Sequence, residues 1–417
     1  MVSLRTLNLA GNRLKEFASS FLQLTNLVNL FLNMNMIDCV PASVQHMTWL
    51  KLLNFSNNKI GSLPLEIGKL NSLKTFIMSY NLLTTLPPTI GGMTALTELS
   101  VSNNQITRLP PILGVMTSLT EVNIQDNFLD QHPVEVVEHA LLLQLKLELN
   151  RLSNIPPEIS RLSTLTFLNF SHNQLRTLPP SIGTLSNLTV LYLNDNKLTR
   201  LPIELGHLSP TMLSRLDNND ITIIPVQVGN LTSLTELWLE GNNIMFLSSS
   251  IGKMQDLKVL HMHNNGLLYL PAEIGNLQTL IELRIPFNEI KVLPADIKHC
   301  FNLRKLSLQH NLLSTVSADV LQSLTNLESL NISRNQIVYV PGTVGCLHAL
   351  QKLRMDQNQV RSLPSEIGGC SSLTLLSITC NQFSSLPDEL SSCSLLTALH
   401  ISGNRFFQLP RCIESLK

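Results

Sequence analysis

The sequence is poor in charge and has no long apolar run. Of its 417 residues only 14% are Asp, Glu, Lys or Arg, and the basic and acidic residues balance at 29 each. A chain without net charge has no field that attracts nucleic acid or an anionic membrane surface. No run reaches the roughly 18 apolar residues that a transmembrane helix needs. Because a leucine pattern starts as early as Leu4, we also expect no signal peptide.

Catalytic motifs and clustered cysteines are missing as well. The sequence has no GxSxG, no HExxH and no glycine-rich phosphate loop, so it predicts neither an enzyme nor a bound cofactor or metal. Its seven cysteines are an odd number and do not cluster near either end. Extracellular repeat proteins usually close their ends with disulfide-bonded caps, so this distribution favours a reducing, cytoplasmic setting.

One unit is repeated along the whole sequence. The stretch Leu188–Pro202 reads L-x-x-L-x-L-x-x-N-x-L-x-x-L-P, and the unit closes after 23 residues. Its asparagine recurs every 23 residues, with a single interval of 24 between Asn311 and Asn335. A period of about 20–29 residues with this pattern is typical of a leucine-rich repeat. The eighteen asparagines are Asn12, Asn35, Asn58, Asn81, Asn104, Asn127, Asn150, Asn173, Asn196, Asn219, Asn242, Asn265, Asn288, Asn311, Asn335, Asn358, Asn381 and Asn404.

Each part of the unit predicts a local structure. The alternating leucines, such as Leu191 and Leu193, predict a short strand with both side chains inward, and such strands stack in parallel. Proline stands six places after fifteen of the eighteen asparagines and favours short 3₁₀ or irregular crossovers over long helices. The asparagine amide can pair with backbone groups where the chain leaves the strand. The longer repeat suits a true helical turn at residues 317–324.

These features predict an α/β leucine-rich repeat solenoid, or horseshoe, of about eighteen repeats. Its parallel sheet would line the concave face, and short turns or 3₁₀ segments would cover the convex face. We expect residues 1–417 to form a single domain without capping elements at either end. Cys300, Cys370 and Cys393 stand where other repeats have leucine, so we expect them to be buried.

The exposed positions of the strands predict a binding surface. The column four places before each asparagine changes from small polar to aromatic and basic residues over five repeats. Tyr, Trp and Arg are the residue types that are enriched at the energetic centres of protein interfaces. We expect a partner-binding site made of this column, the column two places before the asparagine, and two residues one place further on. Its residues are Tyr192, Arg215, Trp238, His261 and Arg284; Asn194, Asp217, Glu240 and His263; and Asp195 and Phe287.

Two other interpretations of these residues remain. Surface variation with cross-strand pairing, such as Arg215 with an acidic neighbour, would need no partner. Alternatively, His261 and His263 both face outward and run beside Glu240 and Asp217, which could form a zinc site. Two solvated histidines in a patch of mixed charge are the simpler interpretation, and we favour no metal.

The crossover motif LPxEIGxLxxL suggests a family. It occurs at residues 63–70, 270–277 and 363–368, and with it the chain resembles the intracellular Ras-group leucine-rich repeat proteins, which include the Ras–Raf pathway scaffold and plant Ras-group repeat proteins. That resemblance implies a scaffold or adaptor in intracellular signal transduction. It also implies that the concave face binds protein partners such as a small GTPase or a phosphatase subunit.

The motif belongs to the repeat class, so two other functions stay open. The chain could be a recognition segment of a larger multidomain signalling protein with a GTPase, kinase, phosphatase or cyclase domain. A secreted receptor ectodomain is the third possibility, and the absence of a signal peptide and of cysteine caps disfavours it.

Overall fold

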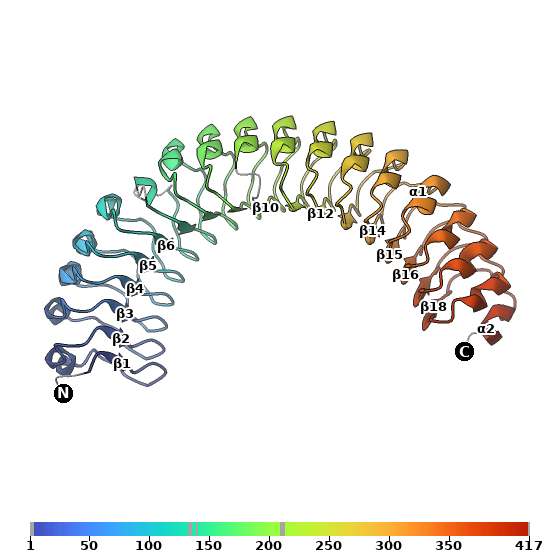
Figure 1. Ribbon diagram of the computed structural model, residues 1–417. Coiled ribbons are helices and arrows are strands. Elements are labelled where there is room, and N and C mark those ends of the chain that lie inside the picture. The colour runs from blue at the N-terminus through green and yellow to red at the C-terminus, as the bar shows by residue number, and fades with distance from the viewer. Residues whose placement is uncertain (1–3, 132–135, 139–140, 209–212, 416–417) are drawn as a thin grey trace. The chain divides into compact units, whose positions relative to one another are not determined.

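Each repeat forms one short strand and one crossover turn. The computed structural model describes residues 4–131, 136–138, 141–208 and 213–415 (Figure 1). The chain divides into two compact units: unit 1 contains residues 1–198 and 207–209, and unit 2 contains residues 199–206 and 210–417. In each unit the strands form a parallel sheet on one face, here called the strand face, and the crossovers form the opposite, 3₁₀ face. The predicted solenoid of about eighteen repeats is confirmed.

The strands are three residues long and pair one whole repeat apart. Leu53 pairs with Phe76 in unit 1 and Leu260 pairs with Leu283 in unit 2, so the inward apolar side chains form a row within each unit. The strands of unit 1 are β1 Thr6–Asn8, β2 Asn29–Phe31, β3 Leu52–Asn54, β4 Thr75–Ile77, β5 Glu98–Ser100, β6 Glu121–Asn123, β7 Gln144–Lys146, β8 Phe167–Asn169 and β9 Val190–Tyr192. Those of unit 2 are β10 Leu213–Arg215, β11 Glu236–Trp238, β12 Val259–His261, β13 Glu282–Arg284, β14 Lys305–Ser307, β15 Ser329–Asn331, β16 Lys352–Arg354, β17 Leu375–Ser377 and β18 Ala398–His400.

The crossovers are 3₁₀ turns, as the prolines predict. Proline typically occupies the position before the turn, as Pro271 does with φ −68° and ψ 153°. Ser248 takes this place in one repeat, and its hydroxyl accepts a hydrogen bond from the Ser250 amide instead. The turns are η1 Ser19–Gln23, η2 Ala42–His46, η3 Leu65–Lys69, η4 Pro88–Gly92, η5 Pro111–Val115, η6 Val136–Glu138, η7 Pro157–Arg161, η8 Pro180–Thr184, η9 Ile203–His207, η10 Val226–Asn230, η11 Ser249–Lys253, η12 Ala272–Asn276, η13 Ala295–His299, η14 Gly342–Cys346, η15 Ser365–Gly369 and η16 Asp388–Ser392.

Two of the crossovers that the structure describes are α-helical. Helix α1, Ala318–Ser323, lies in the repeat with the extra residue, which confirms the helical turn predicted there. Helix α2, Arg411–Ser415, is the last described element. No helix among the described residues has the length and apolar character to cross a membrane.

The repeated asparagine joins each repeat to the one before it. The Nδ2 of Asn104 donates to the carbonyls of Val101 and Ser102 in its own repeat and of Met78 in the preceding one, all at 3.0 Å. Its Oδ1 accepts from the Leu83 amide at 3.0 Å. The same pattern recurs through both units, so the predicted role of the asparagine is confirmed.

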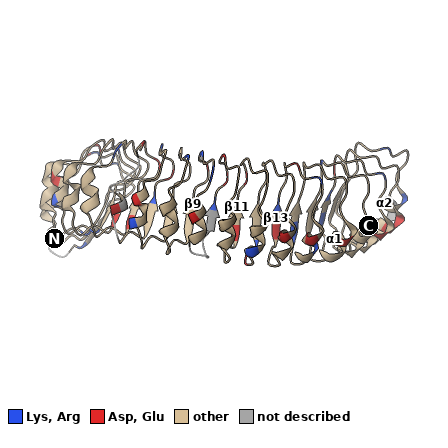
Figure 2. Ribbon diagram, turned by 90° about the horizontal axis from the view of Figure 1, so that it is seen from above, with Lys and Arg blue, Asp and Glu red and all other residues tan. Residues whose placement is uncertain are grey.

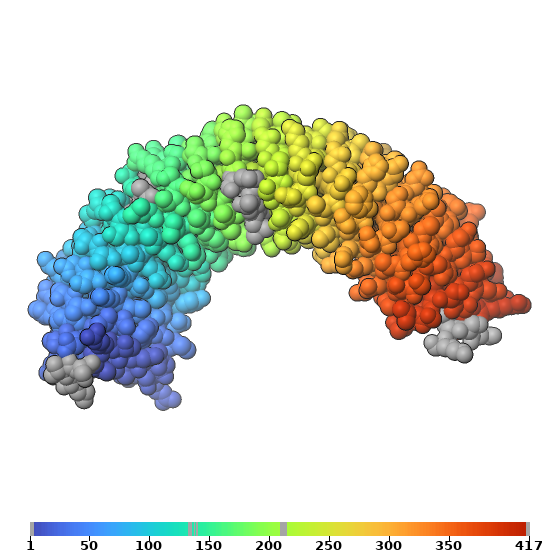
Figure 3. Space-filling model, in the orientation of Figure 1, coloured from blue at the N-terminus to red at the C-terminus, as the bar shows by residue number. Residues whose placement is uncertain are grey.

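Side chains fill the interior of each unit. The space-filling view shows that they close the gaps that the ribbon leaves between successive repeats of a unit (Figure 3). Cys300, Cys370 and Cys393 are fully buried, as predicted, and burial raises the pKa of the Cys300 and Cys370 thiols to about 12. Lys, Arg, Asp and Glu are sparse and interspersed in the view of Figure 2.

Candidate functional site

The predicted site residues are divided between the two units. Tyr192, Asn194 and Asp195 belong to unit 1, whereas the others belong to unit 2. In unit 2, successive strands place Arg215 beside Trp238, Trp238 beside His261, and His261 beside Arg284. The sheet therefore brings the unit 2 part of the central column together in one row across β10–β13.

Trp238 is the centre of this row. The guanidinium carbon of Arg215 lies 4.1 Å from the centre of the indole ring, a cation–π contact. On the other side, the His261 ring meets the indole at 4.2 Å between centroids and an interplanar angle of 68°. The indole Nε1 donates to Glu236 Oε2 at 3.1 Å. Trp238 is thus held by three neighbours while its side chain stays partly exposed.

Glu282 organises the other half of the row. Its Oε1 lies 2.9 Å from His261 Nε2 and also pairs with Arg284 Nε, and its Oε2 lies 3.1 Å from Lys305 Nζ. Burial raises the pKa of Glu282, but hydrogen bonds from His261 and Lys305 and the charge of Arg284 outweigh it, so the pKa lies below the ordinary value. Sequence reasoning missed Glu282 and Glu236, because it left out the strand position two places before the central column. That position also points outward.

His261 differs from the expectation that both histidines face solvent. It is only 3% exposed, since Trp238 and Glu282 pack against it. Burial lowers its pKa, and the hydrogen bond to Glu282, which raises it, does not compensate. His263 is half-buried, and its pKa is also lowered, first by burial and then by the charges of His261 and Arg284.

The acidic residues of the site are also more buried than expected. Asp217 is 6% exposed, and Glu240 lies half-buried in the next repeat with its Oε2 atom enclosed. Burial, together with the nearby charge of Asp217, raises the pKa of Glu240. No group of three or more His, Cys, Asp or Glu side chains suited to holding a metal ion occurs among the described residues.

Phe287 presents an aromatic ring at the edge of the site. It has a positive φ of 55°, a conformation that costs energy for a bulky residue, and its side chain is 47% exposed. The ring stacks on His310 at 4.0 Å between centroids. The Phe287 ring therefore contacts the next repeat through His310.

The unit 1 residues form a smaller group of their own. Tyr192 meets the Phe167 ring edge-on at 5.8 Å, and Asn194 Nδ2 donates to Asp195 Oδ2 at 2.7 Å. His172 Nε2 lies 3.5 Å from the same Asp195 oxygen. This group is polar apart from its two rings.

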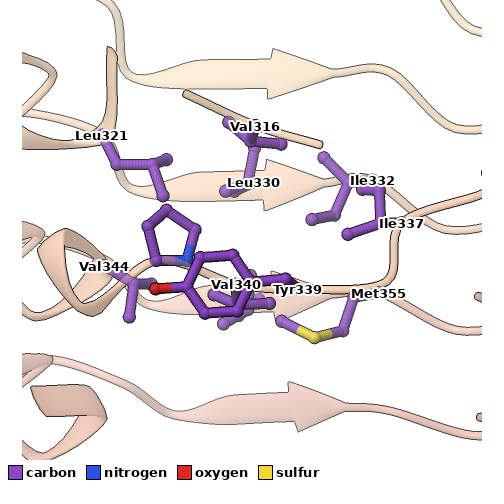
Figure 4. A pocket seen from close by; sticks show the side chains of 11 residues that line it. Val316, Leu321, Leu330, Ile332, Ile337, Tyr339, Val340, Val344 and Met355 are labelled. Atoms are coloured by element: carbon purple, nitrogen blue, oxygen red, sulfur yellow. The ribbon is translucent and has the colours of Figure 1, made fainter. Parts of the chain in front are cut away.

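One apolar cavity in unit 2 is too small for an organic ligand. It lies between repeats of the C-terminal half, where Tyr339, Val340 and Val344 line it with eight other residues (Figure 4). Its volume is about 10 Å³, room for one water molecule at most, and its lining is apolar. A wider, open hollow of about 370 Å³ is lined by Gln255, Asp256, Asn276, Gln278 and Thr279. The row on the strand face is the candidate for recognition because its aromatic and arginine side chains contact one another.

Comparison with known proteins agrees with this architecture. Models of leucine-rich repeats match residues 3–24, 38–146, 163–205 and 301–360. No curated protein matches the chain. A leucine-rich repeat protein of Leptospira interrogans is 30% identical with a TM-score of 0.78, and the match covers 95% of this chain and 96% of that one.

Two further structures are similar to the chain. The leucine-rich repeat ectodomain of the Arabidopsis thaliana membrane receptor kinase GASSHO1/SCHENGEN3, solved in complex with CASPARIAN STRIP INTEGRITY FACTOR 2, is 27% identical with a TM-score of 0.78. That match covers all of this chain and 55% of the ectodomain chain. YopM from Yersinia enterocolitica, at 24% identity and a TM-score of 0.69 over 99% of this chain and 86% of its own, shows the fold alone. The chain belongs to the leucine-rich repeat family, whose members in general serve as protein-binding scaffolds.

Proposed function

We propose that the strand face of β10–β13 is a protein-binding site and that the chain acts as a scaffold. The observation that carries the proposal is the row of Arg215, Trp238, His261 and Arg284, fixed by Glu236 and Glu282 on four successive strands. A partner that binds there meets side chains already held in place, so little conformational freedom is lost on binding.

Trp238 is the anchor of the proposed site. It offers a large ring whose orientation is set on both sides, by Arg215 and by His261. Arg284 contributes a side chain that is 46% exposed, and its pairing through Nε leaves the terminal nitrogens of the guanidinium for acidic groups on a partner. Phe287 adds apolar area at the edge. An aromatic anchor next to arginine is typical of interface centres.

The cellular setting is also part of the proposal. The LPxEIGxLxxL crossovers support an adaptor in cytoplasmic signal transduction, in the manner of the Ras-group proteins, with a small GTPase or a phosphatase subunit as partner. One observation favours a second candidate, a recognition segment within a larger signalling protein. The chain is similar to about half of a plant receptor kinase ectodomain at 27% identity.

Affinity capture tests the binding site. Wild-type chain and the Trp238→Ala variant are immobilised, and proteins bound from a lysate are quantified by mass spectrometry. Each purified partner is then titrated against both chains. We expect truncation of Trp238 to weaken binding by about 2 kcal/mol or more, a roughly 30-fold rise in Kd. The double variant Trp238→Ala, Arg284→Ala should weaken it further.

Two controls make the experiment decisive. Phe301→Ala removes an exposed aromatic side chain from the turn between η13 and β14, away from the strand face, and should leave affinity unchanged. Thermal unfolding of each variant shows whether the fold is intact. A partner that still binds the Trp238→Ala variant, but no longer binds when Glu273 on the 3₁₀ face is replaced, would show that the proposed face is wrong.

A further inference from the structure

A second surface lies on the flank of unit 2, between the asparagine turn and the 3₁₀ turn. The position four places after the repeated asparagine is mostly polar along the chain, with residues such as Ser62, Arg108 and Thr177. In four consecutive repeats of unit 2 it is apolar instead. We call these four residues the flank stripe: Ile223, Phe246, Tyr269 and Val292.

The flank stripe is exposed and ordered. Ile223 is 68% exposed, Phe246 48%, Tyr269 51% and Val292 65%. Isolated parallel bridges join Ile223 to Phe246 and Phe246 to Tyr269, and the two aromatic rings lie 5.5 Å apart. The backbone therefore fixes the spacing of the stripe, one side chain per repeat. None of these residues takes part in the row around Trp238.

The segments around the two central residues of the stripe, Phe246 and Tyr269, contain no charged residue. Residues 241–249 and 264–272 contain no Asp, Glu, Lys or Arg. Met245, beside Phe246, is 49% exposed and adds to the apolar surface. If each whole side chain offers on the order of 150–250 Å², these five side chains leave on the order of 500 Å² of apolar surface in water. That area is near the upper end for the largest patch of a monomer, ~300–600 Å².

We propose that the flank stripe binds the same stripe of a second copy of this chain, forming a two-fold dimer. The order of the stripe is aliphatic, aromatic, aromatic, aliphatic. A two-fold axis between Phe246 and Tyr269 therefore places each aromatic ring against an aromatic ring and Ile223 against Val292. A two-fold contact brings a patch onto itself, so an uncharged centre avoids like-charge repulsion.

The exposed apolar area of the flank stripe fits a contact with a second copy of the chain. Two stripes with Met245 would bury on the order of 1,000 Å² together, and the exposed Val226 and half-buried Leu268 nearby extend the contact. The sum approaches the roughly 1,200–2,000 Å² of a stable interface. We therefore expect a dimer that forms at micromolar concentration.

Sedimentation velocity of the full chain tests the dimer. Wild type at about 100 μM, well above a micromolar Kd, should sediment at twice the 46.4 kDa mass of the chain. Phe246→Lys and Tyr269→Glu should each be monomeric, with at least a tenfold weaker association. In a mixture of the two variants, Lys at 246 of one chain faces Glu at 269 of the other, and Tyr269 still faces Phe246. The mixture should therefore dimerise again.

The controls separate this proposal from the binding site on the strand face. Phe301→Lys changes an exposed phenylalanine away from the stripe and should leave the dimer intact, as should Trp238→Ala. A monomeric wild type overturns the proposal, even if another protein binds the stripe. So does a dimer that persists in Phe246→Lys, or a mixture that stays monomeric while both variants remain folded by circular dichroism.

Discussion

The repeated asparagine shows how one residue type can be required at a position. Asn104 satisfies three carbonyls with Nδ2 and one amide with Oδ1 while its side chain is 7% exposed. Leucine has the size but no polar atoms, and aspartate has no donor. Only a carboxamide of this length both donates and accepts at the turn, which is why sequence alone could assign its role.

Replacing Asn104 with Ala should destabilise the chain. The variant leaves backbone groups of two repeats without their partner inside the protein, and we expect a loss of about 1–3 kcal/mol in the free energy of unfolding. Urea unfolding followed by circular dichroism measures it. Gln105→Ala, at the exposed neighbouring position, is the control and should change stability little. Equal effects of both substitutions would contradict the assigned role.

His261 predicts how the stability of unit 2 depends on pH. Its folded-state pKa lies below the ~6.5 of an unfolded histidine, so the unfolded chain binds the proton more readily. The contribution of neutral His261 to the free energy of unfolding is therefore fully present above pH ~6.5. That contribution is lost as pH falls through the folded-state pKa. His263 acts in the same direction. The raised pKa of Glu240 acts in the opposite direction at lower pH.

His261→Gln isolates this contribution. Between about pH 7.5 and 5.5 the wild type should lose more unfolding free energy than the variant, in which no proton is taken up at this position. His400→Gln, at an exposed position of the same unit, is the matched control and should keep the wild-type pH dependence. If His261→Gln loses as much stability as the wild type over this range, His261 is not held neutral by burial.

At the scale of elements, the turns hold residues in backbone conformations that are unfavourable for their side chains. The residue before the repeated asparagine has positive φ in repeat after repeat, including Tyr80 at 57°, Leu149 at 56° and Phe287 at 55°. Neither leucine nor phenylalanine signals such a turn in a sequence. The shared backbone geometry of the array determines it, which is why sequence reasoning did not anticipate the strained backbone of Phe287.

The 3₁₀ turns pack so closely that some positions require glycine. A Cβ placed on Gly275 in η12 would lie 2.3 Å from the carbonyl oxygen of Asp296 in the next turn. Since backbone atoms must move to relieve that contact, Gly275→Ala should cost about 1–3 kcal/mol of unfolding free energy.

A matched glycine provides the comparison for urea unfolding. At Gly266 the nearest atom to an added Cβ would be 3.7 Å away, and the backbone has no positive φ. Gly266→Ala should therefore leave stability unchanged or raise it by about 0.4–1 kcal/mol. Similar losses in both variants would show that turn packing is not the reason for glycine at 275.

At the scale of the molecule, the sequence predicted the solenoid because each position of the repeat has one structural role. The 23-residue register placed the strands, the prolines predicted the 3₁₀ crossovers, and the extra residue predicted α1. The burial of His261 could not be read in the same way. It depends on the rotamer of Trp238 and on Glu282, in a neighbouring strand, and a one-dimensional pattern contains neither.

The asparagine hydrogen bonds also determine how early the chain can become ordered during synthesis. Among the described residues, each repeated asparagine lies at most 27 residues along the chain from its hydrogen-bond partner. The bond from Asn335 to Leu308 has this longest separation. A repeat emerging from the ribosome can therefore complete its bonds to the preceding repeat without waiting for the rest of the chain. Nascent protein should gain protease resistance in steps of about one repeat, in keeping with nearest-neighbour stability in repeat arrays.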